Sequence, residues 1–146
     1  MPTALITGTT SGIGQASAYT LAKQGYHLIL NGRRKDRLEE QAKELEKKYG
    51  IQTLLMPVDV RNHNEVADFF NSLPQAWKSI HVLINNAGLA AGMNTLEEGS
   101  LDHWNRMIDT NIKGLLHVTK HLIPILKKTN GHIVNIGSIA GKEVYT

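Results

Sequence analysis

The chain has 146 residues, of which 41% are hydrophobic and 20% charged, as in an ordinary globular protein with one continuous core. It contains no cysteine, which excludes disulfides and thiolate metal sites and favours a reducing cytosol. The formal charge of +3 indicates no class of partner, and no apolar run approaches the roughly 20 residues that span a membrane. The N-terminus lacks the basic start of a secretion signal. We therefore expect a single cytoplasmic domain over residues 1–146.

Short β-rich runs alternate with longer amphipathic segments along the chain. We predict strands at Thr3–Thr7, His27–Asn31, Gln52–Val58, His81–Ile84 and His132–Ile136. We predict helices at Gly12–Lys23, at Arg34–Tyr49, after an Asn62 cap, and from a Ser100 cap to about Lys127, with Pro124 bending or ending the last one. The strands are nearly continuous apolar runs, which is typical of parallel strands covered on both faces. The chain therefore predicts an α/β fold with a doubly wound, Rossmann-like parallel sheet of about five strands.

The last predicted helix has an apolar stripe that includes one polar side chain. The apolar members of the stripe are Leu101, Trp104, Ile108, Leu115, Val118 and Leu122. Asn111 falls between Ile108 and Leu115, where a buried amide needs hydrogen-bond partners. A structural role for Asn111, as a satisfied amide that fixes the position of the helix, is therefore expected.

A glycine-rich turn, T-G-T-T-S-G-I-G at residues 7–14, follows the first strand and opens the first helix. Gly8 allows a tight turn, Gly12 lets the backbone approach a pyrophosphate, and Gly14 allows close packing of the helix. The unpaired N–H groups and the dipole of the helix N-terminus favour a diphosphate. A purely structural turn is the alternative, and the lack of G-K-[ST] argues against a P-loop. The predicted dinucleotide contacts of this turn are Gly8, Thr10, Ser11, Gly12, Ile13 and Gly14.

The end of the second strand indicates which dinucleotide binds. An acidic side chain near this point would bind the ribose 2′-hydroxyl of NAD, but the sequence here is Asn31-Gly32-Arg33-Arg34. Arg33 can clamp a 2′-phosphate bidentately, and Arg34 either helps or only begins the next helix. We therefore predict NADP(H) rather than NAD(H). The basic cluster at residues 33–37 is short and lacks interleaved aromatics, which argues against nucleic-acid binding.

Four motifs follow predicted strands in a characteristic order. They are the turn at residues 7–14, Asp59-Val60 after the third strand, Asn85-Asn86-Ala87-Gly88 after the fourth, and Ser138 after the fifth. In this order they resemble the short-chain dehydrogenase/reductase family over essentially the whole chain. The resemblance implies that Asp59 binds the adenine amino group with Val60 beside it. It also implies that Asn85, Ala87 and Gly88 border the cofactor and brace the central sheet.

The same resemblance implies two catalytic residues. Ser138 lies at the carboxyl end of the fifth strand, where open parallel sheets place ligands, and its hydroxyl would stabilise the substrate's carbonyl or alcohol oxygen. Asn111 would hold a water molecule in a proton relay, in addition to its structural role. The implied reaction moves a hydride between NADP(H) and a small carbonyl or secondary-alcohol substrate. The segment N-G-R-R-K-D-R-L is similar to members that act on small hydroxy acids or 3-oxoacyl groups.

The sequence departs from the family at its end, because the Y-x-x-x-K motif is absent. Tyr145 comes too soon after Ser138 for the family's spacing, and no lysine follows it, so we interpret Tyr145 as a loop residue. We therefore expect a chain truncated before this motif and the last strands, with the fifth strand as an exposed edge. Such a chain alone would bind the cofactor but not transfer hydride. A non-catalytic dinucleotide-binding module with the same fold is the alternative.

Two further expectations concern metals and partners. His117 and His121 have i, i+4 spacing, but no H-E-x-x-H motif and no third ligand accompany them, so we expect no metal site and a surface or interface pair. The resemblance implies a homo-oligomer, because the family often pairs the long helix across a two-fold axis in dimers and tetramers.

Overall fold

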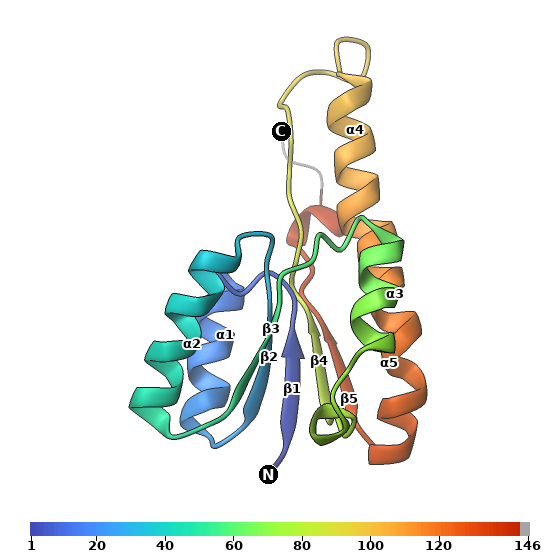
Figure 1. The fold of residues 1–146 in the computed structure, drawn as a ribbon. Coiled ribbons are helices and arrows are strands. Elements are labelled where there is room, and N and C mark those ends of the chain that lie inside the picture. The colour runs from blue at the N-terminus through green and yellow to red at the C-terminus, as the bar shows by residue number, and fades with distance from the viewer. Residues whose placement is uncertain (144–146) are drawn as a thin grey trace.

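The computed structural model of the protein describes residues 1–143 and contains a five-stranded sheet. The strands are β1 (Thr3–Ile6), β2 (His27–Asn31), β3 (Thr53–Met56), β4 (Val82–Asn85) and β5 (His132–Asn135). Their order is β3-β2-β1-β4-β5, and every neighbouring pair is parallel (Figure 1). The predicted doubly wound α/β fold is confirmed. The order reverses between β1 and β4, which makes their carboxyl ends the expected place for a ligand.

Helices cover both faces of this sheet. They are α1 (Gly12–Lys23), α2 (Lys35–Tyr49), α3 (His63–Asn71), α4 (Leu101–Ile108) and α5 (Leu115–Thr129), with a π-helical segment η2 (Asp109–Gly114) between the last two. Short 3-10 turns are η1 (Gln75–Trp77) and η3 (Ile139–Gly141). Helices α1 and α2 lie on one face and α3 and α5 on the other (Figure 1). No helix among residues 1–143 is both long enough and apolar enough to cross a membrane.

The core is divided between the two faces by the alternation of side chains along each strand. In β1, Leu5 packs into the cluster under α3 and α5, whereas Ala4 and Ile6 pack into the cluster under α1 and α2. All three side chains are fully buried. Successive side chains of a strand point to opposite faces, so a strand covered on both sides must be apolar at every position. This explains why TALI forms the centre of the sheet.

Most of the predicted helix boundaries agree with the structure. Gly50, with φ +67°, ends α2, and Leu38 and Leu45 are fully buried as expected. The Asn62 side chain accepts a hydrogen bond from the Glu65 amide at 3.2 Å and so caps α3. The third strand is shorter than predicted, because Pro57 follows Met56 and has no N–H for a ladder hydrogen bond.

The long helix expected from the Ser100 cap to about Lys127 is present, because α4, η2 and α5 follow one another without a break, but it is not regular. The helix passes through the π-helical segment η2, and Pro124 lies inside α5 without ending it. Helix α4 extends past the carboxyl edge of the sheet (Figure 1), and there Leu101 and Ile108 are 70% and 45% exposed. The predicted stripe therefore breaks, since a π-helical turn takes in an extra residue and rotates the faces on either side. Asn111 lies in this turn and is exposed rather than buried.

Candidate functional site

The turns that follow β1, β2, β3 and β4 meet at the carboxyl edge of the sheet. In the first turn, Gly8 and Gly12 have φ values of +67° and +56°, the left-handed region that glycine adopts without strain. Gly14 is buried, and a methyl group there would overlap the Gly8 carbonyl oxygen and the Asn86 side chain. The three glycines thus keep the backbone of this turn close to α1 and to the turn after β4.

Thr7 and Asn86 lock the turns after β1 and β4 together. The Asn86 side-chain amide donates hydrogen bonds to the carbonyl oxygens of Thr7 and Gly8 at 3.0 and 2.9 Å. In return, the Thr7 hydroxyl oxygen accepts from the backbone N–H groups of Asn86 and Ala87 at 3.0 and 2.9 Å. Both residues belong to the motifs predicted from the sequence, but neither was predicted to have a role in the site. The role of Asn86 could have been predicted from two facts together. Its side-chain amide can donate two hydrogen bonds, and it lies in the turn after the strand next to β1.

Asn31 makes the corresponding connection to β3. Its side-chain amide donates to the carbonyl oxygens of Met56 and Val58 at 3.0 and 2.9 Å, and its oxygen accepts from the Gly8 N–H at 3.3 Å. Asn31 is only 2% exposed, so these hydrogen bonds are protected from water. The glycine-rich turn is therefore held from both sides, by Asn31 on one and Asn86 on the other.

Asn85, a predicted cofactor contact, instead points its side chain into the protein. Its amide nitrogen donates to the Thr119 hydroxyl at 3.0 Å and to the Asn135 side-chain oxygen at 2.9 Å. It thereby joins β4 to α5 and β5, which matches the expected brace of the central sheet. A direct cofactor contact of this side chain stays a prediction.

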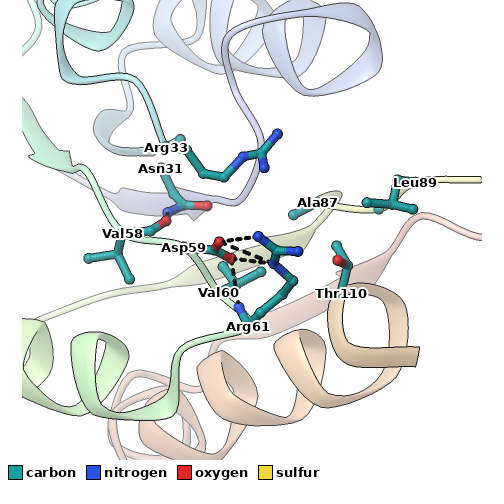
Figure 2. Close-up of a pocket in the computed structure, with 11 residues that line it drawn as sticks. Asn31, Arg33, Val58, Asp59, Val60, Arg61, Ala87, Leu89 and Thr110 are labelled. Atoms are coloured by element: carbon teal, nitrogen blue, oxygen red, sulfur yellow. Dashed lines mark hydrogen bonds and ion pairs between the residues drawn. The ribbon is translucent and has the colours of Figure 1, made fainter. Parts of the chain in front are cut away.

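A cavity at the carboxyl ends of β2, β3 and β4 brings several predicted residues together (Figure 2). Arg33, Asp59, Val60, Ala87 and Gly88 all line it. Its other lining residues were not predicted to be part of the site, and they are Asn31, Gly32, Val58, Arg61, Leu89 and Thr110. Segments far apart in the sequence thus form one hollow beside the glycine-rich turn.

An ion pair lies in the middle of this cavity wall (Figure 2). The Arg61 guanidinium approaches the Asp59 carboxylate at 2.7 Å (Nη2 to Oδ2) and 3.1 Å (Nε to each oxygen). These hydrogen bonds from Arg61 hold the pKa of Asp59 below its usual value, and the charge of Arg33 acts in the same direction. Asp59 is therefore a carboxylate that only accepts hydrogen bonds.

A second, open pocket adjoins the cavity and is basic. Thr10, Ser11, Arg33, Arg34 and Arg37 line it. It combines the predicted residues of the glycine-rich turn with the predicted arginines, and it adds Arg37 from the first turn of α2. Three guanidinium groups beside two hydroxyl groups can bind a phosphate monoester. Arg37 lies three residues after Arg34 on a helix, and this spacing is the signal that would have included it.

The predicted catalytic residues Asn111 and Ser138 lie on separate elements. The Asn111 amide donates to the Leu89 carbonyl oxygen at 2.8 Å, and its oxygen accepts from the Leu89 N–H at 2.9 Å. Asn111 therefore satisfies its amide and ties η2 to the segment after Gly88, even though it is exposed. Ser138 is also exposed and accepts from the Ala140 N–H at 3.2 Å, which opens η3. The interpretation of Tyr145 lies outside the described residues, and the catalytic roles stay predictions.

The histidines of the predicted surface or interface pair are half-buried and pack against α3. His117 Nδ1 lies 2.8 Å from the Val60 carbonyl oxygen, and His121 stacks on Phe70 of α3 at 5.3 Å between ring centroids. His63 contacts both rings. Within residues 1–143, no group of three or more His, Asp or Glu side chains is arranged to hold a metal ion. The pair therefore fastens α5 to α3 and to the end of β3.

Thr110 gives a test of the cavity wall that needs no ligand. Its hydroxyl is buried and has no hydrogen-bond partner among the described residues, an arrangement that destabilises a protein by about 1–3 kcal/mol. Valine has nearly the same shape without the hydroxyl, so we expect Thr110→Val to raise the free energy of unfolding by about 1 kcal/mol. Urea denaturation measures this. Thr129→Val is the control. It removes a hydroxyl that donates to the Ile80 carbonyl oxygen at 2.7 Å, so the free energy of unfolding should fall. A fall in both variants would contradict the prediction.

Comparisons with known proteins agree with this arrangement. The family model for short chain dehydrogenase matches residues 2–146. The NADP-dependent 3-hydroxy acid dehydrogenase YdfG of Escherichia coli K12 is 41% identical over 142 residues, which cover 97% of this chain and 56% of that protein. Sulfoacetaldehyde reductase 2 of Chromohalobacter salexigens is 44% identical over 143 residues, with coverages of 97% and 56%. The chain thus spans a little over half the length of these curated relatives.

A solved structure supports the same assignment of the fold. The alcohol dehydrogenase from the archaeon Thermococcus sibiricus, complexed with 5-hydroxy-NADP, superposes with a TM-score of 0.94 at 33% identity. The match covers 99% of this chain and 61% of that one.

Proposed function

The chain belongs to the short chain dehydrogenase family, and on this basis we propose that it binds NADP(H) for hydride transfer between the nicotinamide and a carbonyl or secondary-alcohol substrate. Residues 1–146 form a single dinucleotide-binding unit in this proposal. The observation that carries it is the basic pocket of Arg33, Arg34 and Arg37 beside the glycine-rich turn. Relatives that are named NADP-dependent, and a structure with an NADP derivative bound, support the choice of cofactor.

Each part of the dinucleotide has a matching part of the site. The diphosphate lies at the N-terminus of α1, where the N–H groups of Gly12, Ile13 and Gly14 precede the first hydrogen bond of the helix, from the Gln15 N–H to the Ser11 carbonyl oxygen. The adenine enters the cavity of Figure 2, beside Asp59 and Val60. The 2′-phosphate lies in the basic pocket, where Arg33 borders both hollows. Thr10 and Ser11 add hydroxyl donors there, and Ala87 and Gly88 border the adenosine ribose.

Ser138 and Asn111, which are not among the predicted cofactor contacts, indicate the chemistry of the substrate. The Ser138 hydroxyl binds the oxygen that becomes a carbonyl or an alcohol, and Asn111 holds a water molecule for proton transfer. Small hydroxy acids and 3-oxoacyl groups are the substrate classes, in line with the names of the relatives. Those relatives are dehydrogenases and reductases, so they give no support to a non-catalytic dinucleotide-binding module.

A homo-oligomer and a cytoplasmic location complete the proposal. The oligomer forms through the α4–α5 region, where several large apolar side chains remain exposed. They are Leu101, Ile108, Ile112, Leu116 and Ile123. The lack of cysteine fits a reducing cytoplasm.

The choice of NADP(H) is tested by replacing Arg33. Charge-assisted, bidentate hydrogen bonds to a phosphate contribute about 1.5–3 kcal/mol, so Arg33→Ser should weaken NADPH binding by about 10- to 100-fold and leave NADH binding nearly unchanged. Fluorescence titration of the protein with each dinucleotide measures the ratio. Arg106→Ser, at an exposed position on α4, is the control and should preserve the preference for NADPH. Equal affinity of the unmodified protein for NADH and NADPH would contradict the proposal.

A further inference from the structure

We propose that Arg61 is a positioning residue for base recognition, which fixes the Asp59 carboxylate so that the cavity accepts a 6-amino purine and rejects a 6-oxo purine. This inference rests on the proposed function, because the purine is the adenine of NADP(H). Arg61 itself need not touch the base. It acts through Asp59, whose side chain lines the same cavity (Figure 2).

Arg61 fixes the plane of the Asp59 carboxylate by its geometry. An aspartate side chain on a turn can rotate about its Cβ–Cγ bond, which would turn its two oxygens into or out of the cavity. Here the Arg61 backbone N–H binds Oδ1 at 3.0 Å, Nε approaches both oxygens at 3.1 Å, and Nη2 binds Oδ2 at 2.7 Å. A planar fork of this kind fixes the plane of the carboxylate. Three N–H groups bind a carboxylate that offers about four lone-pair sites, so it keeps acceptor capacity for one further donor from a ligand.

The backbone of Asp59 is already fixed by hydrogen bonds to other residues. The Asp59 N–H donates to the Glu65 carboxylate at 3.2 Å, and its carbonyl oxygen accepts from the Asn62 N–H at 2.9 Å. Asp59 therefore sits on a rigid turn at the start of α3, and the one freedom left to it is the orientation of its carboxylate. That freedom is what Arg61 removes.

Arg61 also keeps Asp59 in its charged form. The pKa of Asp59 is lowered mainly by its hydrogen bonds to Arg61, so the group remains an acceptor as the solution becomes acidic. An exocyclic amino group at purine C6 donates to such an acceptor, whereas a C6 carbonyl places a second acceptor against it. A C6 carbonyl facing the carboxylate leaves both acceptors without a hydrogen bond. A site that binds its ligand through a hydrogen bond therefore rejects a 6-oxo purine strongly.

The charged and titratable groups around Asp59 come from four segments. Arg33 lies on the turn after β2, Arg61 on the turn after β3, His63 and Glu65 on α3, and Asp109 on η2. A comparison of two ligands that differ only at purine C6 cancels the effect of these charges on the shared phosphates.

The experiment compares NADP⁺ with its deaminated form, nicotinamide hypoxanthine dinucleotide phosphate, by isothermal titration calorimetry at pH 7.5 and pH 5. We expect the unmodified protein to prefer NADP⁺ by about tenfold or more at both pH values. In Arg61→Gln, the preference should fall severalfold at pH 7.5. It should fall to a similar extent at pH 5, because an aspartate of ordinary pKa, about 3.9, is still ionised there and what is lost is the fixed orientation of its carboxylate. Arg61→Lys, which keeps the charge without the planar fork, should give an intermediate preference, and Asp59→Asn should favour the hypoxanthine form.

Arg106→Gln is the matched control, and it should keep the preference of the unmodified protein at both pH values. If Arg61→Gln does not fold, as judged by circular dichroism, Arg61→Lys provides the same comparison. Failure of the unmodified protein to bind either dinucleotide would overturn the proposed function and this inference with it. Binding of both dinucleotides with equal affinity would overturn the inference alone. So would Arg61 variants that keep the full preference at pH 5.

Discussion

Replacement of Gly14 by alanine is expected to destabilise the protein by about 2–3 kcal/mol and to abolish measurable NADPH binding. The added methyl group would overlap the Gly8 carbonyl oxygen and the Asn86 side chain. Neither can yield easily, because Asn86 donates two hydrogen bonds into the turn and Asn31 holds the Gly8 N–H from the other side. Urea denaturation gives the free energy of unfolding, and fluorescence titration gives the affinity for NADPH.

Gly137→Ala is the control for this effect. A methyl group at Gly137 has no atom of the described residues within 4 Å, and its φ is not in the left-handed region. Its free energy of unfolding should change by less than about 0.5 kcal/mol. If Gly14→Ala were as stable as Gly137→Ala and still bound NADPH, the close contact of the turn with α1 would not matter for binding.

Replacement of Thr7 by valine is expected to lower the free energy of unfolding by about 2–4 kcal/mol, because two N–H groups lose their acceptor together. Thr7 is only 3% exposed, so water cannot readily replace its hydroxyl oxygen. The amides of Asn86 and Ala87 would remain unpaired at the turn that lines the cavity. NADPH binding should weaken in parallel, since the same turn borders the cofactor in the proposed complex.

Two further variants distinguish the effect of the Thr7 hydroxyl from that of its methyl group. Thr7→Ser keeps the acceptor and should retain most of the stability. Thr20→Val makes the valine substitution on the exposed surface of α1, where the hydroxyl bonds only its own helix, and should have little effect. Loss of stability in Thr7→Ser equal to that in Thr7→Val would show that packing of the methyl group, rather than hydrogen bonding, is what matters.

The strands and most helices follow from the sequence because their residues repeat with the period of the structure. β1 is apolar at Ala4, Leu5 and Ile6 since both of its faces are covered, and Gly50 marks the end of α2 by its left-handed backbone. The π-helical segment η2 could not be predicted in this way. A 3.6-residue period places Ile108 and Leu115 on one apolar stripe. The extra residue in the π-helical turn between them puts them on different faces.

The glycines of the site could be predicted from their backbone freedom and the arginines from their charge, because both properties have few other uses at the ends of strands. The residues that hold these groups in place could not be predicted. Asn31 and Asn86 act through partners far away in the sequence, and a local pattern does not indicate which carbonyl oxygens they meet. Arg61 pairs with Asp59 only because the turn after β3 folds back on itself, a conformation that has no periodic signature.

The lock between Thr7 and Asn86 also constrains when the site can form during folding. Its hydrogen bonds join residues 79 positions apart, so the loop between them must close before any of these bonds is made. The glycine-rich turn and α1 are local, but they acquire their final geometry only after β4 has docked beside β1. A dinucleotide that needs this geometry therefore binds only after the sheet is complete. Its binding raises the free energy of unfolding, and the increase grows with the logarithm of the dinucleotide concentration.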